Sequence, residues 1–184
     1  MARTETRGAD TPEKLETAKI VADAVEAFLG AGVPAIERAC NERRLLILEY
    51  LRSRPAGATL PEWGLRNVTV ETAIEEASPE FQLTECPVPL LVQLADVRYP
   101  ENPEVPMACG RDKAGCHIFV FFPVCREWLQ RAPLLLELTT WHEMLHACGD
   151  CENDGIVRHN KIGVDSVVQL LTGKSLTIDG PPCL

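Results

Sequence analysis

The sequence lacks any apolar run approaching the ~18 residues that a membrane-spanning helix needs. It is also poor in basic side chains, with 18 Lys and Arg against 27 Asp and Glu, which gives a net charge of −9. Because phosphates are held by clustered Lys and Arg, this balance argues against nucleic acid or an anionic membrane surface as the main partner. The 184 residues, with an ordinary share of apolar and charged side chains, predict one folded domain and exclude disorder.

No secretory signal is visible, because the polar N-terminus of mixed charge is not followed by an apolar segment. We therefore expect a cytoplasmic location, where reducing conditions disfavour disulfides. The eight cysteines then predict metal ligands, reactive thiols or, most simply, buried small apolar side chains. The alternatives are a disulfide between Cys148 and Cys151 or one among Cys109, Cys116 and Cys125.

Start and stop signals divide the first 54 residues into two helices. Thr11 and Pro12 form a helix start, and Gly30 ends that helix. Pro34 opens the second helix, whose polar residues we expect on a solvated face: Glu37, Glu42, Arg43 and Arg44. The elements expected after residue 60 are an ambiguous stretch over 63–78, strands over 89–94 and 117–122, a long functional loop over 99–113, and helices over 134–148 and about 159–171.

The predicted helix over 134–148 carries His142-Glu143-Met144-Leu145-His146. Histidines four residues apart share one helix face, so both imidazoles can reach one ion. Glu143 is displaced by about 100° around the helix, which places its carboxylate beside the ion, where a base for a metal-bound water is needed. With 4 histidines, the pattern arises by chance in roughly one such chain in a hundred. Its helical context therefore favours a metal site over two ordinary histidines.

This motif makes the segment over roughly residues 88–172 resemble the zincin zinc metallopeptidases. The resemblance implies Zn²⁺ held by His142 and His146, Glu143 as general base, and hydrolysis of an amide bond in a peptide or protein substrate. In those families an edge strand that precedes the helix lines the cleft, and the strand over 117–122 has that place in this chain. An extended substrate could pair with such a strand. Tyr99, His117 and, if it is not a metal ligand, His159 are candidate donors to the oxyanion.

The third ligand has several candidates, because a catalytic zinc site takes three protein ligands and one water. His159 is the first, since its spacing resembles that of the SprT/Spartan-type zincins. Asp165 stands close to where gluzincins and aspzincins place a carboxylate ligand. Glu152 fits the spacing of the metzincin motif, although no Met follows Met144 as that family requires. A fourth possibility uses the loop residues Asp150, Asp154 or Cys151.

The expected fold is α+β: a small zincin-like domain with a short mixed sheet, an active-site helix and a C-terminal helix, preceded by two N-terminal helices. We expect one domain over 1–184, with an N-terminal helical part over 11–54 and a catalytic part over 60–184. Two other functions fit the same motif. One is a non-peptidase zinc hydrolase acting on a small molecule, with the loop over 99–113 as a lid. The other is a non-catalytic protein whose structural zinc is closed by Cys148 or Cys151. The oligomeric state is not predicted.

Overall fold

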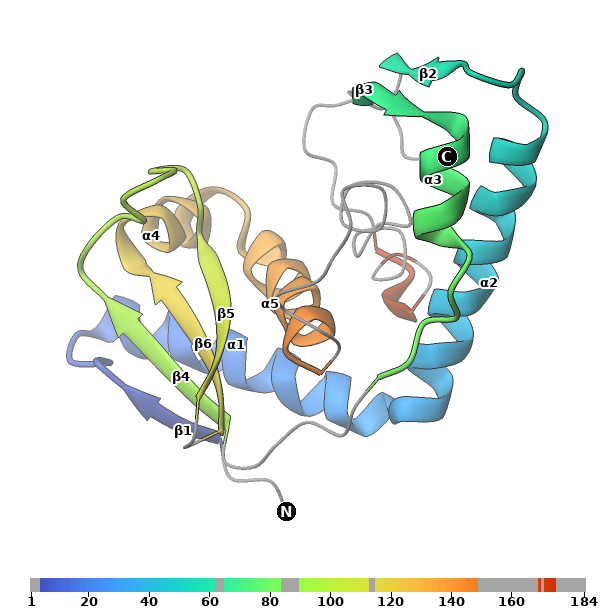
Figure 1. Cartoon of the computed structure of the whole chain (residues 1–184). Helices are drawn as coiled ribbons and strands as arrows, with labels where there is room; N and C mark the ends of the chain where they lie inside the picture. Colours follow the sequence, from blue (N-terminus) through green and yellow to red (C-terminus); the bar gives the residue numbers. More distant parts are fainter. Residues whose placement is uncertain are drawn as a thin grey trace. The chain divides into compact units, whose positions relative to one another are not determined.

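The structure, a computed structural model of the chain, describes residues 4–61, 65–83, 90–112, 115–148, 169 and 171–174. It has the predicted α+β character, and its residues form two compact units (Figure 1). The first unit is drawn from Met1–Gly32 and Thr84–Cys151, and the second from Val33–Leu83 and Glu152–Leu184. The sequence predicted a helical part over 11–54 and a catalytic part over 60–184, and this division stays a prediction. The two units divide the chain at a different place, between its first two helices.

The first unit contains a mixed four-stranded sheet in the order β1-β4-β6-β5 (Figure 1). Its strands are β1 (Thr4–Arg7), β4 (Leu90–Ala95), β5 (Met107–Asp112) and β6 (Gly115–Phe121). β4 is parallel to both of its neighbours, β1 and β6, and β5 runs antiparallel to β6. The mixed sheet and the strands β4 and β6 are confirmed predictions, whereas β1 and β5 were not predicted.

The predicted edge strand is in fact internal. On β6, His117 pairs with Leu91 of β4 on one side and with Gly110 of β5 on the other. The edge beside β6 is therefore β5, which occupies the second half of the loop predicted over 99–113. The sequence of β5 has little β-propensity of its own, so its conformation depends on pairing with the buried strand β6.

Helices pack on one face of this sheet. The side chains of Cys116, Ile118 and Val120 are fully buried there. The thiol of Cys116 donates a hydrogen bond of 3.4 Å to the carbonyl of Ala147 in α5 (Pro133–Cys148), which places α5 on that face. The remaining helices of the unit, α1 (Pro12–Ala31) and α4 (Phe122–Arg131), both pack against α5.

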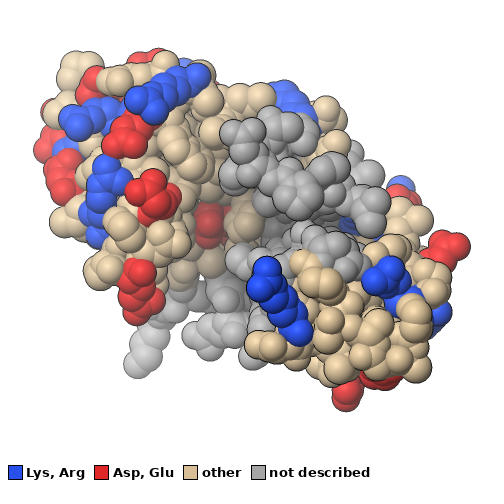
Figure 2. Space-filling view, turned by 90° about the horizontal axis from the view of Figure 1, so that it is seen from above, with Lys and Arg blue, Asp and Glu red and all other residues tan. Residues whose placement is uncertain are grey.

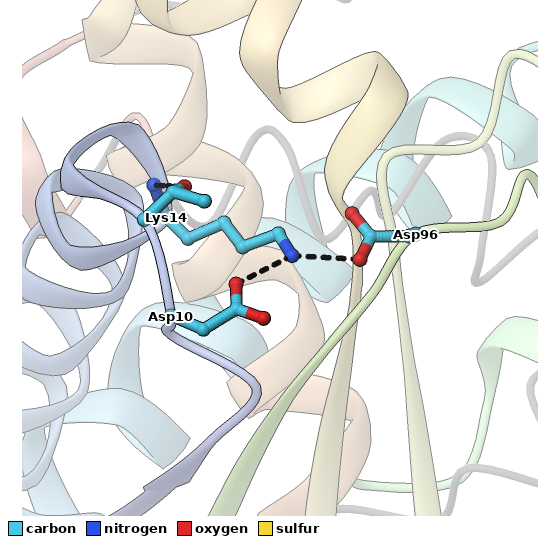
Figure 3. Close-up of polar contacts among 4 residues, drawn as sticks. Asp10, Lys14 and Asp96 are labelled. Carbon is cyan, nitrogen blue, oxygen red and sulfur yellow. Dashed lines mark hydrogen bonds and ion pairs between the residues drawn. The ribbon is translucent and has the colours of Figure 1, made fainter.

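Helix α1 starts as predicted, because the Thr11 side chain accepts a hydrogen bond of 3.3 Å from the amide of Lys14. Its buried face includes Lys14, whereas the neighbouring Leu15 is 58% exposed. The ammonium of Lys14 lies 2.7 Å from a carboxylate oxygen of Asp10 and 2.7 Å from one of Asp96 (Figure 3). The hydrogen bond with Asp10 and, second, the one with Asp96 raise the pKa of Lys14. The contact with Asp96, which follows β4, also connects α1 to the end of that strand.

The second unit contains α2 (Val33–Arg52), α3 (Val70–Ala77) and a two-stranded antiparallel sheet of β2 (Thr59–Leu60) and β3 (Leu65–Thr69). The stretch with both strand and helix features therefore divides into β3 followed by α3. The core of this unit joins both helices to both strands through Ile47, Leu48, Leu51, Leu60, Leu65, Val70, Ala73 and Ala77.

Two charged residues of α2 are structural rather than solvated, contrary to the prediction. Arg44 is 7% exposed and donates a hydrogen bond of 2.8 Å to the carbonyl of Ser78. Glu37 accepts a hydrogen bond of 2.9 Å from the amide of Leu83. Both partners lie in or after α3, so only the tertiary fold brings them within reach.

Candidate metal centre

The motif lies on α5, which is a core helix rather than a surface helix. Pro133 opens the helix, and the residues from Leu138 to Cys148 are all buried except His142, which is half-buried. Leu134, in the first turn, is 42% exposed, whereas Leu136 and Leu138 are fully buried. A helix that is apolar on most sides is held in place by its surroundings, and it therefore offers a rigid base for ligands.

The two predicted ligands meet on one side of α5. The Nε2 atoms of His142 and His146 are 3.0 Å apart, and the ring centroids are 4.7 Å apart. Two zinc–nitrogen bonds of ~2.0–2.1 Å at a tetrahedral angle would separate such atoms by about 3.3 Å. The two nitrogens therefore lie within about 0.3 Å of a chelating separation, and the imidazole pair fits a shared Zn²⁺ ion.

Glu143 is 8% exposed, as is His146. A glutamate on the solvated side of a helix would be exposed, so this carboxylate faces the interior of the protein. A buried acid in sequence between two convergent imidazoles is a candidate functional group. It has the residue type and position that a base acting on a metal-bound water requires.

The third ligand is not settled among the residues that the structure describes. His159, Asp165 and Glu152 all lie outside them, as do Asp150, Cys151 and Asp154. Within the described ranges, no three His, Cys, Asp or Glu side chains are grouped so that they could hold a metal ion. The predicted C-terminal helix over about 159–171 also falls outside, apart from residues 169 and 171.

Cys148 does not supply a metal-binding thiolate, because its sulfur is in a disulfide bond. It also follows His146 by two residues on the same helix, which places it about 200° around the axis from that ligand. In this structure Cys148 is therefore not available as the thiolate of a structural zinc site, and the alternative with Cys151 stays a prediction. Cys109 on β5 is disulfide-bonded as well. Among the cysteines that the structure describes, Cys40, Cys116 and Cys125 are free thiols, all of them buried.

The structure describes two of the three candidate oxyanion donors, His117 and Tyr99. Neighbouring residues of a strand point to opposite faces, and Cys116 points toward α5, so His117 points away from it. The ring of His117 stacks on Phe119 with centroids 5.8 Å apart. The ring of Tyr99 packs on Phe121, and its hydroxyl lies 3.3 Å from the Glu101 carboxylate. The prediction that His117 serves the site is therefore wrong, because that residue is on the other side of the sheet.

The feature that sequence reasoning missed is the position of β5 beside α5. The hydroxyl of Thr140, two residues before His142, contacts the sulfur of Met107 at 3.7 Å. Met107 is the first residue of β5. The local signal for this strand is the alternation of the apolar residues Met107 and Cys109. A pattern of two residues is too short to distinguish a strand from a loop.

The surface visible in Figure 2 shows acidic and basic side chains interspersed over the described residues, rather than a continuous basic area. None of the described helices combines the length and apolarity needed to cross a membrane. The chain matches no known protein family, no curated protein and no solved structure.

Proposed function

We propose that this protein is a zinc-dependent metallopeptidase of the His-Glu-x-x-His type that hydrolyses amide bonds in peptides or proteins. The observation that carries the proposal is the 3.0 Å separation of the His142 and His146 Nε2 atoms on a buried helix that also carries the buried residue Glu143. Each feature alone has a structural explanation. Two imidazoles at chelating separation, with an acid at the position of a general base, together fit the chemistry of hydrolysis.

Within this proposal His142 and His146 hold the ion. Zinc, when bound, supplies a water whose pKa is lowered to roughly 7 and a positive charge next to the scissile carbonyl. Glu143 would be the general base that takes up a proton and returns it to the leaving nitrogen. His159 is the proposed third ligand, with Asp165 and Glu152 as alternatives.

The substrate strand is proposed to be β5 instead of β6. A peptide can add only to a strand with an unpaired edge, and β6 is paired on both sides. β5 has a partner on one side only among the described strands, and it packs against α5. An extended peptide paired with β5 would therefore run alongside the helix that carries the two histidines.

The decisive experiment combines metal content with peptide cleavage. Glu143→Gln should keep one Zn²⁺ per chain and lose cleavage of a peptide library followed by mass spectrometry, since only the base is removed. His146→Ala should lose the metal, whereas His117→Gln, on the opposite face of the sheet, should keep both metal and activity. Full activity of Glu143→Gln, or stoichiometric zinc in His146→Ala, would contradict the proposal. A small-molecule hydrolase would show a zinc-bound wild type that cleaves no peptide.

The third ligand can be assigned by the same metal analysis. His159→Ala, Asp165→Ala and Glu152→Ala are compared for the dissociation constant of Zn²⁺. Only the variant that lacks a ligand should bind the ion much more weakly, and we expect it to be His159→Ala. An unchanged affinity in that variant, with a loss in one of the others, would move the site to a different zincin subtype.

We keep a cytoplasmic location as part of the proposal. The disulfide-bonded state of Cys109 and Cys148 weighs against it, because such bonds persist in oxidising compartments. Alkylation of the protein in intact cells, followed by mass spectrometry, distinguishes a cytoplasmic location from an oxidising compartment. Alkylated Cys109 and Cys148 would support the cytoplasm, and a preserved disulfide would exclude a reducing compartment.

A further inference from the structure

The strand β1 forms the other edge of the described sheet. It pairs with β4 on one side only, and its residues Glu5, Thr6 and Arg7 are exposed. An exposed edge with unpaired backbone groups is a template for a further strand. This edge lies on the far side of the sheet order from β5, so it is separate from the proposed substrate strand.

A hollow of about 560 Å³ lies alongside β1. Its walls are Thr6, Gly8, Ala9 and Asp10 from β1 and the turn after it, and Leu15, Ala18, Lys19 and Ala22 from α1. The floor on α1 is therefore mostly small and apolar, and Leu15 is 58% exposed. Thr6 pairs with the fully buried Val92, so the hollow is on the helix-covered face of the sheet. A strand added to β1 would cover Leu15.

The charges on β1 indicate which strand fits. Glu5 and Arg7 stand two residues apart on the face opposite the hollow, with Arg7 Nε 2.9 Å from Glu5 Oε1. An antiparallel copy of β1 centred on Thr6 would place Glu5 opposite Arg7 of the partner subunit, and Arg7 opposite Glu5 of the partner subunit. A parallel copy in register would instead set like charges opposite each other, which is destabilising.

We propose that two copies of this chain form a symmetric dimer by antiparallel pairing of their β1 strands. A twofold axis through Thr6, perpendicular to the sheet, keeps both α1 helices on the same face. Leu15, Ala18 and Ala22 then face the same residues of the second copy across the hollow. Small side chains at such a contact allow the helices to approach closely. The pairing is isologous and closes on itself, so it forms a dimer and not a filament.

The test is a charge exchange measured by sedimentation equilibrium on the full chain. The wild type should be a dimer. Glu5→Arg or Arg7→Glu alone should weaken the dimer by about tenfold or more, because each opposes like charges twice across the axis. The double variant, with both charges exchanged, should regain the wild-type dissociation constant. Leu15→Lys should give a monomer, whereas Leu45→Lys, at an exposed leucine of α2, should leave the dimer unchanged.

A second readout locates the contact. Thr6→Cys should form an intermolecular disulfide under mild oxidation, since Thr6 lies opposite Thr6 of the partner subunit. A wild type that stays monomeric at its highest soluble concentration would refute the proposal. So would a double charge variant as weak as the single ones, since the register would then be wrong. Circular dichroism confirms that each variant is folded. Zinc binding, which depends on α5, is expected to be the same in all of them, so the dimer and the metal site can fail independently.

Discussion

Trp141 offers a sharp test of how the helix that carries the metal motif is held. Its indole is 6% exposed and meets the ring of Phe28 on α1 edge to face, with centroids 5.4 Å apart. The indole Nε1 is buried, and the described part of the structure provides no hydrogen-bond acceptor for it. The ring therefore stabilises the contact between α1 and α5, while its N–H costs free energy.

Two substitutions separate these effects. Trp141→Ala removes the ring and leaves a cavity, which should lower the free energy of unfolding by about 3–5 kcal/mol. Trp141→Phe keeps the ring contact and removes the unsatisfied donor, whose burial costs about 1–3 kcal/mol. That relief offsets the smaller volume of phenylalanine. We therefore expect Trp141→Phe to stay within about 1 kcal/mol of the wild type.

Hydrogen exchange at the amides of α5 is the assay, because it reports the opening of this helix directly. The alanine variant should open roughly 150-fold more often than the phenylalanine variant, which corresponds to about 3 kcal/mol. Phe28→Leu serves as the control on the partner ring and should lie between the two. If Trp141→Phe is as destabilised as Trp141→Ala, the indole N–H contributes a favourable contact and the reasoning is refuted.

The remaining predictions concern charge, thiols and backbone space. Lys14→Met should lower the urea midpoint at neutral pH, because it removes the ion pairs of Lys14. The difference in midpoint from the wild type should shrink above pH 10.5, where Lys14, whose pKa is raised, loses its proton. It should also shrink below pH 3.8, where Asp10, whose pKa is lowered, gains a proton. A constant difference from pH 3 to 11 would contradict the ion pair. Burial raises the pKa of Cys40 and Cys125 to about 12, so neither thiol should react with iodoacetamide at pH 8 until urea unfolds the chain. Gly110→Ala should destabilise the sheet by about 1–3 kcal/mol, because its new Cβ would lie 2.9 Å from a ring on β6; thermal unfolding that is unchanged would show that the ring moves freely.

The elements that sequence patterns predicted correctly are those with local signals. The cap at Thr11 depends on an amide three residues away, and Pro133 marks the start of α5 by its own geometry. The convergence of His142 and His146 has the same origin, because residues four apart on a helix always share a face. Most of the candidate metal centre was therefore predictable from five consecutive residues.

The features that sequence patterns missed depend on partners distant in the chain. The order of the strands decides that β6 is internal and that β5 is the edge beside α5. Asp96, 82 residues away from Lys14, forms a hydrogen bond that stabilises the buried ammonium group of that lysine, whereas Leu15 is exposed. Periodicity states which residues share a face, but not which face the rest of the protein covers. That choice follows from strand pairing and charge pairing between distant segments, and so only the tertiary structure could make it.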